Sequence, residues 1–349
     1  MGDDLSVAEI ARRLRPLAAD LAPKLIPWGR RRGHEWVALK EVGGRPVERS
    51  LVIVIDGAKR GSYFHNSASR GGDLINAAMD LWSLSRADAV AWAKEVLGLG
   101  PGLDPETKAR AQEHARRAQA AAEARAAEVA ESVREKRERA RAYWRAAQPI
   151  AGTLGEVYFR ARAIGGELPP TLRFAPALPY GHPCNPAAPR FPAVVAAVQA
   201  PDGSFSGVWR IYLAADGRGK APVEKPKLGL GVARGGAVRL GPAAPRLATC
   251  EGIETGLSIQ EDAGLPTWAG LSAVGVQNLV LPRLVREPVI VPDPDLAHLN
   301  EKTGAVYWPG PDAAAKAAQR YREEGRRPVV VELPLGLDAN DLKMRSGGL

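Results

Sequence analysis

The chain has 349 residues and a formal net charge of +9. Its two cysteines, Cys184 and Cys250, are too few and too far apart for a disulfide framework or a Cys-x-x-Cys zinc site. No apolar run approaches the roughly 18 residues of a membrane-spanning helix, and the first residues lack the pattern of a secretory leader. We therefore expect a cytoplasmic protein of several domains with no membrane partner.

Residues 1–100 predict a small α+β domain. A helix is expected over residues 6–21, and Ser6 and Glu9 have the spacing of a capping box at its start. Two strands separated by a glycine turn are expected after it, at residues 36–39 and 51–55 with the turn at Gly43-Gly44.

Residues 101–148 predict a charged linker helix. From residue 104 to about residue 147 the sequence consists mostly of Ala, Glu, Arg, Gln and Lys, with neither Gly nor Pro after the first positions. Strong helix formers at this density predict one long helix, roughly 65 Å at 1.5 Å per residue. Tyr143 and Trp144 are expected to fix its end to the segment that follows.

Residues 149–245 predict a mixed, basic subdomain of short strands and turns. A hairpin is expected around Pro201-Asp202-Gly203, between apolar runs at 193–198 and 207–213. Four basic residues on or after this hairpin are candidates for phosphate contact, because guanidinium and ammonium groups bind phosphate oxygens. The plainer interpretation of some of them is a polar loop. The four are Arg210, Arg218, Lys220 and Lys227.

Residues 246–349 alternate predicted strands with predicted helices, and acidic residues follow the strands. The apolar runs 247–250, 288–291 and 328–331 alternate with helical segments, which predicts an α/β fold with a parallel sheet. Because ligands of such sheets bind beyond the carboxyl ends of the strands, the acidic residues should lie along one edge. They are Glu251, Asp293, Asp295, Asp338 and Asp341.

Carboxylates clustered in this way predict a site for Mg²⁺ or Mn²⁺, which prefer oxygen ligands. The natural use of such a site is phosphoryl or nucleotidyl transfer. The alternative is that these residues are solvated loop residues or helix caps.

Three motifs in this segment carry a family resemblance. Glu-Gly-x-x-Thr at 251–255, Asp-x-Asp at 293–295 and Gly-x-Asp-Ala-Asn-Asp at 336–341 resemble the Toprim domain that bacterial and phage primases share with topoisomerases and some nucleases. The resemblance implies that Glu251 is the catalytic acid or base and that Asp293 and Asp295 hold the metal, assisted by Asp338 and Asp341. The chain departs from the family pattern at Pro294, inside the Asp pair, and at residues 296–309, which we interpret as an inserted loop.

The remainder of the chain resembles primases of phages and plasmids. The order of pieces in residues 20–100 is similar to their N-terminal module, which often binds zinc; the necessary cysteines are absent here, so the resemblance carries over the fold and we expect no zinc. In the mixed subdomain that precedes a primase Toprim unit, the resemblance places Arg210 and Lys227 on positions that contact template and nucleotide. Arg218 and Lys220, in a glycine-flanked loop, are further candidates for phosphate contact.

These features together predict metal-dependent synthesis of RNA primers on a single-stranded DNA template, from ribonucleoside triphosphates, in the replication of a phage or other mobile element. A separate replicative helicase is an expected partner, because no helicase motor is recognisable in the sequence. Two alternatives stay open: a Toprim nuclease that cleaves nucleic acid, and a replication accessory that binds DNA without catalysis.

Overall fold

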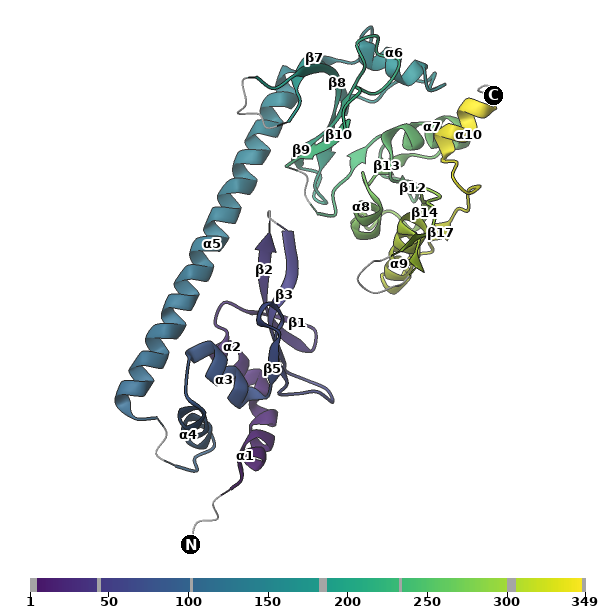
Figure 1. Ribbon diagram of the computed structural model, residues 1–349. Coiled ribbons are helices and arrows are strands. Elements are labelled where there is room, and N and C mark those ends of the chain that lie inside the picture. The colour runs from purple at the N-terminus through teal and green to yellow at the C-terminus, as the bar shows by residue number, and fades with distance from the viewer. Residues whose placement is uncertain are drawn as a thin grey trace. The chain divides into compact units, whose positions relative to one another are not determined.

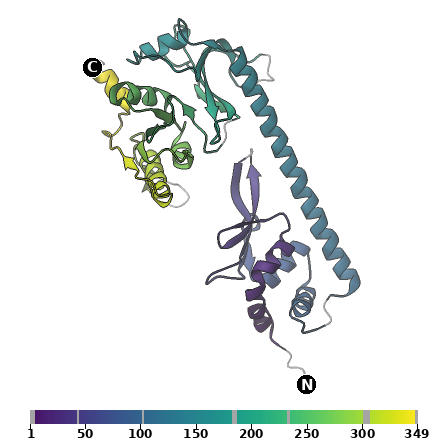
Figure 2. The ribbon, with the colours of Figure 1, turned by 180° about the vertical axis from the view of Figure 1, so that it is seen from behind.

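The computed structural model describes residues 5–42, 45–100, 103–181, 187–231, 234–299 and 306–346. The chain divides into two compact units, Met1–Val133 and Arg134–Leu349, and the division falls within one long helix (Figures 1 and 2). The predicted turn at Gly43-Gly44 and the cysteine Cys184 lie outside the described residues. No helix in the described ranges has both the length and the apolar character needed to cross a membrane.

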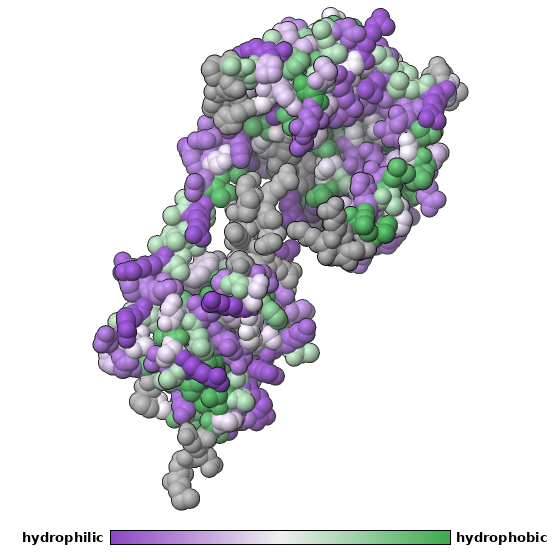
Figure 3. Space-filling view, in the orientation of Figure 1, coloured by the Kyte–Doolittle hydropathy of each residue, from purple (hydrophilic) through white to green (hydrophobic). Residues whose placement is uncertain are grey.

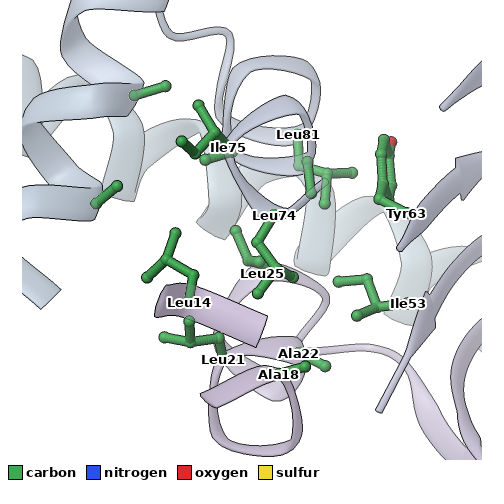
Figure 4. Packing of buried hydrophobic residues seen from close by; sticks show 14 of the residues in the cluster. Leu14, Ala18, Leu21, Ala22, Leu25, Ile53, Tyr63, Leu74, Ile75 and Leu81 are labelled. Carbon is green, nitrogen blue, oxygen red and sulfur yellow. The ribbon is translucent and has the colours of Figure 1, made fainter. Parts of the chain in front are cut away.

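The first unit packs helices against a five-stranded antiparallel sheet with the order β1-β2-β3-β4-β5. Its strands are β1 (Arg30–Arg32), β2 (Glu35–Val42), β3 (Arg45–Val54), β4 (Tyr63–His65) and β5 (Arg70–Gly72). Its helices before the long helix are α1 (Val7–Leu14), α2 (Ala18–Leu25), α3 (Leu74–Trp82) and α4 (Arg86–Val96). Figure 4 shows Leu14, Leu25 and Leu74 from the helices gathered in one core with Ile53 and Tyr63 from the sheet.

The helix predicted over residues 6–21 is interrupted. It ends at Leu14, and a 3₁₀ turn at Arg15–Leu17 leads into α2, because Pro16 has no N–H to donate to the preceding turn. Ser6 caps α1 by accepting from the Glu9 backbone N–H, but the Glu9 carboxylate pairs with Arg12 and Arg13. The predicted capping box is therefore only half formed.

The long helix is α5 (Pro105–Ala146), with 42 residues, as the density of helix formers predicted. In the second unit its last turns carry Ala140, Tyr143 and Trp144 onto one face of an antiparallel sheet. That sheet has the order β10-β9-β8-β7-β6. Its strands are β6 (Gln148–Pro149), β7 (Leu172–Pro179), β8 (Arg190–Gln199), β9 (Phe205–Tyr212) and β10 (Lys227–Leu230), and helix α6 (Leu154–Arg160) follows β6. The predicted hairpin at residues 201–203 joins β8 to β9.

The C-terminal part of the second unit is a mostly parallel sheet between two layers of helices, as predicted. Its order is β11-β13-β12-β14-β17, and only β11 runs antiparallel to its neighbour. The strands are β11 (Val238–Arg239), β12 (Arg246–Cys250), β13 (Thr267–Ala269), β14 (Glu287–Val291) and β17 (Val329–Val330). Helix α7 (Ile253–Ala263) packs on the face that also meets the antiparallel sheet, whereas α8 (Ala273–Asn278) and α9 (Pro309–Glu323) cover the other face. The last helix is α10 (Ala339–Arg345).

Alternation along β12 explains how one strand serves both faces. Ala248 and Cys250 point into the core shared with α7, and Leu247 points into the core shared with α9. The residues predicted as an inserted loop contain a short hairpin of β15 (His298–Leu299) and β16 (Val306–Tyr307). On the face drawn in Figure 3, the described residues are largely hydrophilic, and apolar residues are gathered in a few places.

Candidate active site

The acidic residues of the C-terminal sheet follow strands that end at the same edge. Cys250, the last residue of β12, pairs in parallel with Val291, the last residue of β14. Glu251 therefore leaves the sheet beside the Asp293–Asp295 turn, because parallel strands place their carboxyl ends together. Asp338 reaches the same region as the N-cap of α10.

Burial and mutual repulsion raise the pKa values of Glu251 and Asp293, so these carboxyl groups ionise less readily than usual. Burial raises the pKa of Glu251 to about 8, with further contributions from the charges of Asp293 and Asp295 and a small opposing hydrogen bond from the Ala273 backbone. Burial, Asp338 and Asp295 raise the pKa of Asp293 to about 6, although Lys227 opposes the shift. The cluster is therefore one in which added positive charge is stabilising.

One oxygen of each of these two carboxylates is buried without a partner. Among the described residues, Glu251 Oε1 and Asp293 Oδ1 have no hydrogen-bond donor. A buried oxygen that carries charge and accepts no hydrogen bond is costly, and a cation is the group that satisfies it best. The two unsatisfied oxygens therefore indicate that the residues present fit a divalent ion.

Asp295 is oriented toward the start of α9. Its Oδ2 accepts a hydrogen bond of 2.8 Å from the Gly310 backbone N–H, and its own N–H donates to the Asp293 carbonyl at 2.9 Å. Position 310 needs glycine, because a Cβ there would clash with the carbonyl oxygen of Asp293. Gly310 is thus brought next to the Asp pair in space, although 14 residues separate it from Asp295 in the sequence.

Asp338 and Asp341 form a capping box at the start of α10. Asp341 N–H donates to Asp338 Oδ1 at 2.8 Å, and Asp338 N–H donates to Asp341 Oδ2 at 3.3 Å. Thr255 Oγ1 also donates to Asp338 Oδ2 at 3.3 Å. The helix-cap alternative left open by the sequence therefore describes the contacts of both residues, while Asp338 still adds negative charge beside Asp293.

The described part of the chain contains no three His, Cys, Asp or Glu side chains already gathered as a metal site. The side chains of Asp295, Asp338 and Asp341 instead satisfy backbone N–H groups, as described above. Glu251 and Asp293 each have a buried oxygen without a partner among the described residues, and Asp295 lies two positions beyond Asp293 in the sequence.

A buried ion pair lies next to this edge. The carboxylate of Glu254, on α7, is 2.9 Å from Lys227 Nζ on β10 and accepts a hydrogen bond of 2.6 Å from Tyr158 Oη on α6. Burial alone would raise the pKa of Glu254, but Lys227 and Tyr158 outweigh it and lower this pKa to about 2. Lys227 is thereby held between Glu254 and the charge of Asp293.

Glu254 and Tyr158 were not predicted as site residues from the sequence. The signal for Glu254 was its position on the buried face of a predicted helix, three residues before Leu257. A charged residue on such a face requires a partner, but the sequence does not say which residue supplies it.

Arg210 does not lie beside Lys227. Lys227 pairs with Ile211 across β9 and β10, so Arg210 points to the opposite face of the sheet. There it is buried, donates to Tyr212 Oη at 3.0 Å, and lies over the Tyr143 ring. A shift of one residue along a strand thus separates two residues that the sequence placed in one role.

The remaining basic candidates differ from each other. Although Lys220 is exposed, the surrounding protein partly desolvates its ammonium, and this together with the charge of Lys227 lowers its pKa. Glu254 and Asp338 oppose that shift, so Lys220 lies within electrostatic range of the acidic edge. Arg218 is exposed in the same loop, where its backbone N–H donates to Asp216.

Comparison with known proteins agrees with this geometry. Residues 246–348 match the family described as "Toprim domain", and residues 134–240 match a "Domain of unknown function (DUF7146)". The match over residues 246–348 agrees with the resemblance to the Toprim domain that the three motifs predicted. No curated protein matches the sequence.

Solved structures with similarity to the chain include several primases. The zinc-binding and RNA polymerase domains of the Aquifex aeolicus primase are 13% identical, with a TM-score of 0.40, and the match covers 97% of this chain and 82% of that one. A DnaG primase catalytic domain bound to single-stranded DNA is 17% identical, with a TM-score of 0.41 and coverage of 62% and 77%. The primase fragment of the bacteriophage T7 primase-helicase protein is 15% identical, with a TM-score of 0.32 and coverage of 45% and 59%.

Proposed function

We propose that this protein is a metal-dependent nucleotidyltransferase that synthesises RNA primers on single-stranded DNA from ribonucleoside triphosphates. The observation that supports the proposal most is the pair of oxygens on Glu251 and Asp293 that have no partner among the described residues. The ammonium of Lys227, fixed by Glu254, lies within electrostatic range of Asp293. The proposal includes replication of a phage or other mobile element, a separate helicase as partner, and no zinc.

Each residue has a role that its environment suits. Asp293 and Glu251 would hold Mg²⁺ or Mn²⁺ with Asp295 beside them, and the bound ion would polarise phosphate oxygens and favour ionisation of the attacking hydroxyl. Without an ion, burial and the neighbouring carboxylates raise the pKa of Glu251 to about 8; a bound cation lowers it, so the ionised carboxylate is available to hold the ion or to take the proton of the 3′-hydroxyl. Lys227 and Lys220 supply positive charge for the nucleotide phosphates, and most of the rate would come from positioning and electrostatic stabilisation.

A primer-synthesis assay tests the proposal. The chain is incubated with single-stranded DNA, four ribonucleotides, one of them labelled, and Mg²⁺ or Mn²⁺. Asp293→Asn and Glu251→Gln should each abolish labelled products while the circular dichroism spectrum is unchanged. Glu287→Gln is the matched control. Glu287 is a carboxylate at the first residue of β14, whereas Asp293 follows the last residue of the same strand, and Glu287 pairs with Arg246.

The same assay separates the alternatives. Shortening of end-labelled DNA, abolished by Asp293→Asn, would replace synthesis with cleavage. Absence of both reactions, together with no heat of Mn²⁺ binding in calorimetry, would leave a DNA-binding accessory. Synthesis that survives in Asp293→Asn would remove the proposed site.

A further inference from the structure

The hairpin of β15 and β16 begins and ends at the acidic edge. The chain enters it directly after Asp295 and leaves it through Trp308, the N-cap of α9. Two residues later, the Gly310 N–H is bonded to Asp295 at 2.8 Å, so the two ends of the excursion are held together beside the Asp pair. Any group that the hairpin displays near its ends therefore lies close to the candidate site.

The pairing register sorts the side chains of this hairpin onto two faces. His298 is opposite Tyr307, and Leu299 is opposite Val306. Because residues directly opposite each other share a face, one face carries two rings and the other carries two aliphatic side chains. The ring centroids of His298 and Tyr307 are 5.7 Å apart and their planes are inclined by 38°.

The rings are open to solvent. The exposed fraction is 41% for Tyr307 and 43% for Trp308, and neither residue belongs to a core cluster of the described chain. An isolated two-stranded hairpin is marginally stable in water, and several exposed apolar side chains grouped on one hairpin are typical of an interaction site. Flat rings beside a phosphoryl-transfer edge suit unpaired nucleic-acid bases, because every base has a face that can stack.

We propose that His298 and Tyr307, the ring face of the hairpin, form a stacking surface for unpaired bases of the nucleic acid that enters the acidic site. The proposal rests on the proposed function, since it takes single-stranded nucleic acid as the substrate of that site. The rings would contribute to binding of the strand, and the carboxylates would contribute to the reaction. The inserted residues thus give this Toprim edge its own contact to the substrate strand.

The test is binding of fluorescein-labelled oligo(dT) of about 16 nucleotides, a length within the footprint of single-strand binding folds. Fluorescence anisotropy is measured in EDTA, so that no reaction takes place. The double substitution His298→Ala and Tyr307→Ala should weaken binding by about 10-fold or more, since a stacked base would lose both rings on which it lies. Tyr307→Phe alone keeps a ring at that position and should retain most of the affinity.

Two controls separate stacking from a general effect on the hairpin. Leu299→Ala with Val306→Ala alters the aliphatic face of the same hairpin and should leave oligo(dT) affinity unchanged. Binding to a duplex of equal length should be the same for the chain and its ring variants, because paired bases offer no free face. An equal loss in the aliphatic variant, or an equal loss on duplex, would overturn the proposal.

This result is independent of the outcome for catalysis. Unchanged oligo(dT) affinity in the ring variant would refute the stacking surface and leave a protein as the covering partner, while synthesis that depends on Asp293 would still stand. Conversely, weakened oligo(dT) binding in the ring variant with no synthesis by the unaltered chain would retain the surface and remove the proposed function.

Discussion

Replacement of Lys227 by methionine should destabilise the second unit, because it leaves the buried carboxylate of Glu254 without its counter-ion. Glu254 is 4% exposed, and its carboxylate depends on Lys227 Nζ at 2.9 Å and on Tyr158 Oη at 2.6 Å. Methionine keeps much of the length and volume of the lysine side chain but removes the ammonium. The carboxylate would then be buried with a single hydrogen bond and no counter-charge.

The magnitude follows from the pKa of Glu254, which is lowered from 4.5 to about 2. A difference of about 2.5 units corresponds to roughly 3 kcal/mol, at 1.36 kcal/mol per unit. This agrees with the about 3–5 kcal/mol observed when one partner of a buried pair is removed. At 2–4 °C per kcal/mol for a unit of this size, the melting temperature should fall by about 6–12 °C.

The sign of the pH dependence can also be tested. A carboxyl whose pKa is lower in the folded state stabilises fully above its unfolded pKa, and this stabilisation is lost as the pH falls through the folded pKa. The difference between the unaltered chain and Lys227→Met should therefore shrink as the pH falls, beginning at the pKa of Glu254 in the variant, which burial holds above 4.5, and ending near pH 2. Scanning calorimetry measures the transition, and hydrogen exchange of α7 assigns it to the second unit.

Two companion variants make the reasoning refutable. Glu254→Gln should cost less stability than Lys227→Met, because the lysine side chain that is left without its partner is 29% exposed and its ammonium can reach water. The double variant should be more stable than Lys227→Met alone, since no buried charge is left unpaired. An unaltered melting temperature in Lys227→Met at pH 7, or a larger loss in Glu254→Gln, would refute this account of the pair.

Two further predictions concern the acidic edge and the first unit. Mn²⁺ affinity should rise between about pH 6 and pH 8, because an ion binds ionised carboxyls and Asp293 and Glu251 lose their protons over this range. Calorimetry should show the proton release as a heat of binding that depends on the buffer. An affinity that is constant over this range would contradict the shared site. Asp80→Asn should speed hydrogen exchange of β4 without affecting α7. The reason is that Asp80 accepts a hydrogen bond from Tyr63 Oη and contacts His65 Nδ1, each at 2.6 Å, and pairs with Arg70 at 2.8 Å. Unchanged exchange in β4 would show that these contacts do not stabilise the strand.

Much of the fold could be predicted from the sequence because its signals are local. The density of helix formers marked α5, and the alternation of apolar runs with helical segments marked the parallel sheet. Strand β13 and helix α8 were missed because they have only 3 and 6 residues, too few to show a period. The break after Leu14 was also missed, although Pro16 was its visible cause.

The candidate site was less predictable, because its contacts join distant parts of the chain. The motifs identified the strand ends at Glu251 and Asp293, which a parallel sheet brings to one edge. The face on which Arg210 lies depends on the register between β9 and β10, and local sequence does not specify that register. The partners of Glu254 come from α6 and β10, 96 and 27 positions away, so only the folded chain reveals them.

The Lys227–Glu254 pair also has a consequence for how such proteins can diverge. Lys227 lies in the segment that matches the domain of unknown function, and Glu254 lies in the Toprim segment, so the pair crosses a boundary between two families. Recombination that brought in a Toprim segment without a matching acid would leave the lysine without its counter-ion. We therefore expect the two segments to be inherited together, and a chimera assembled from different relatives would have to contain both residues of the pair.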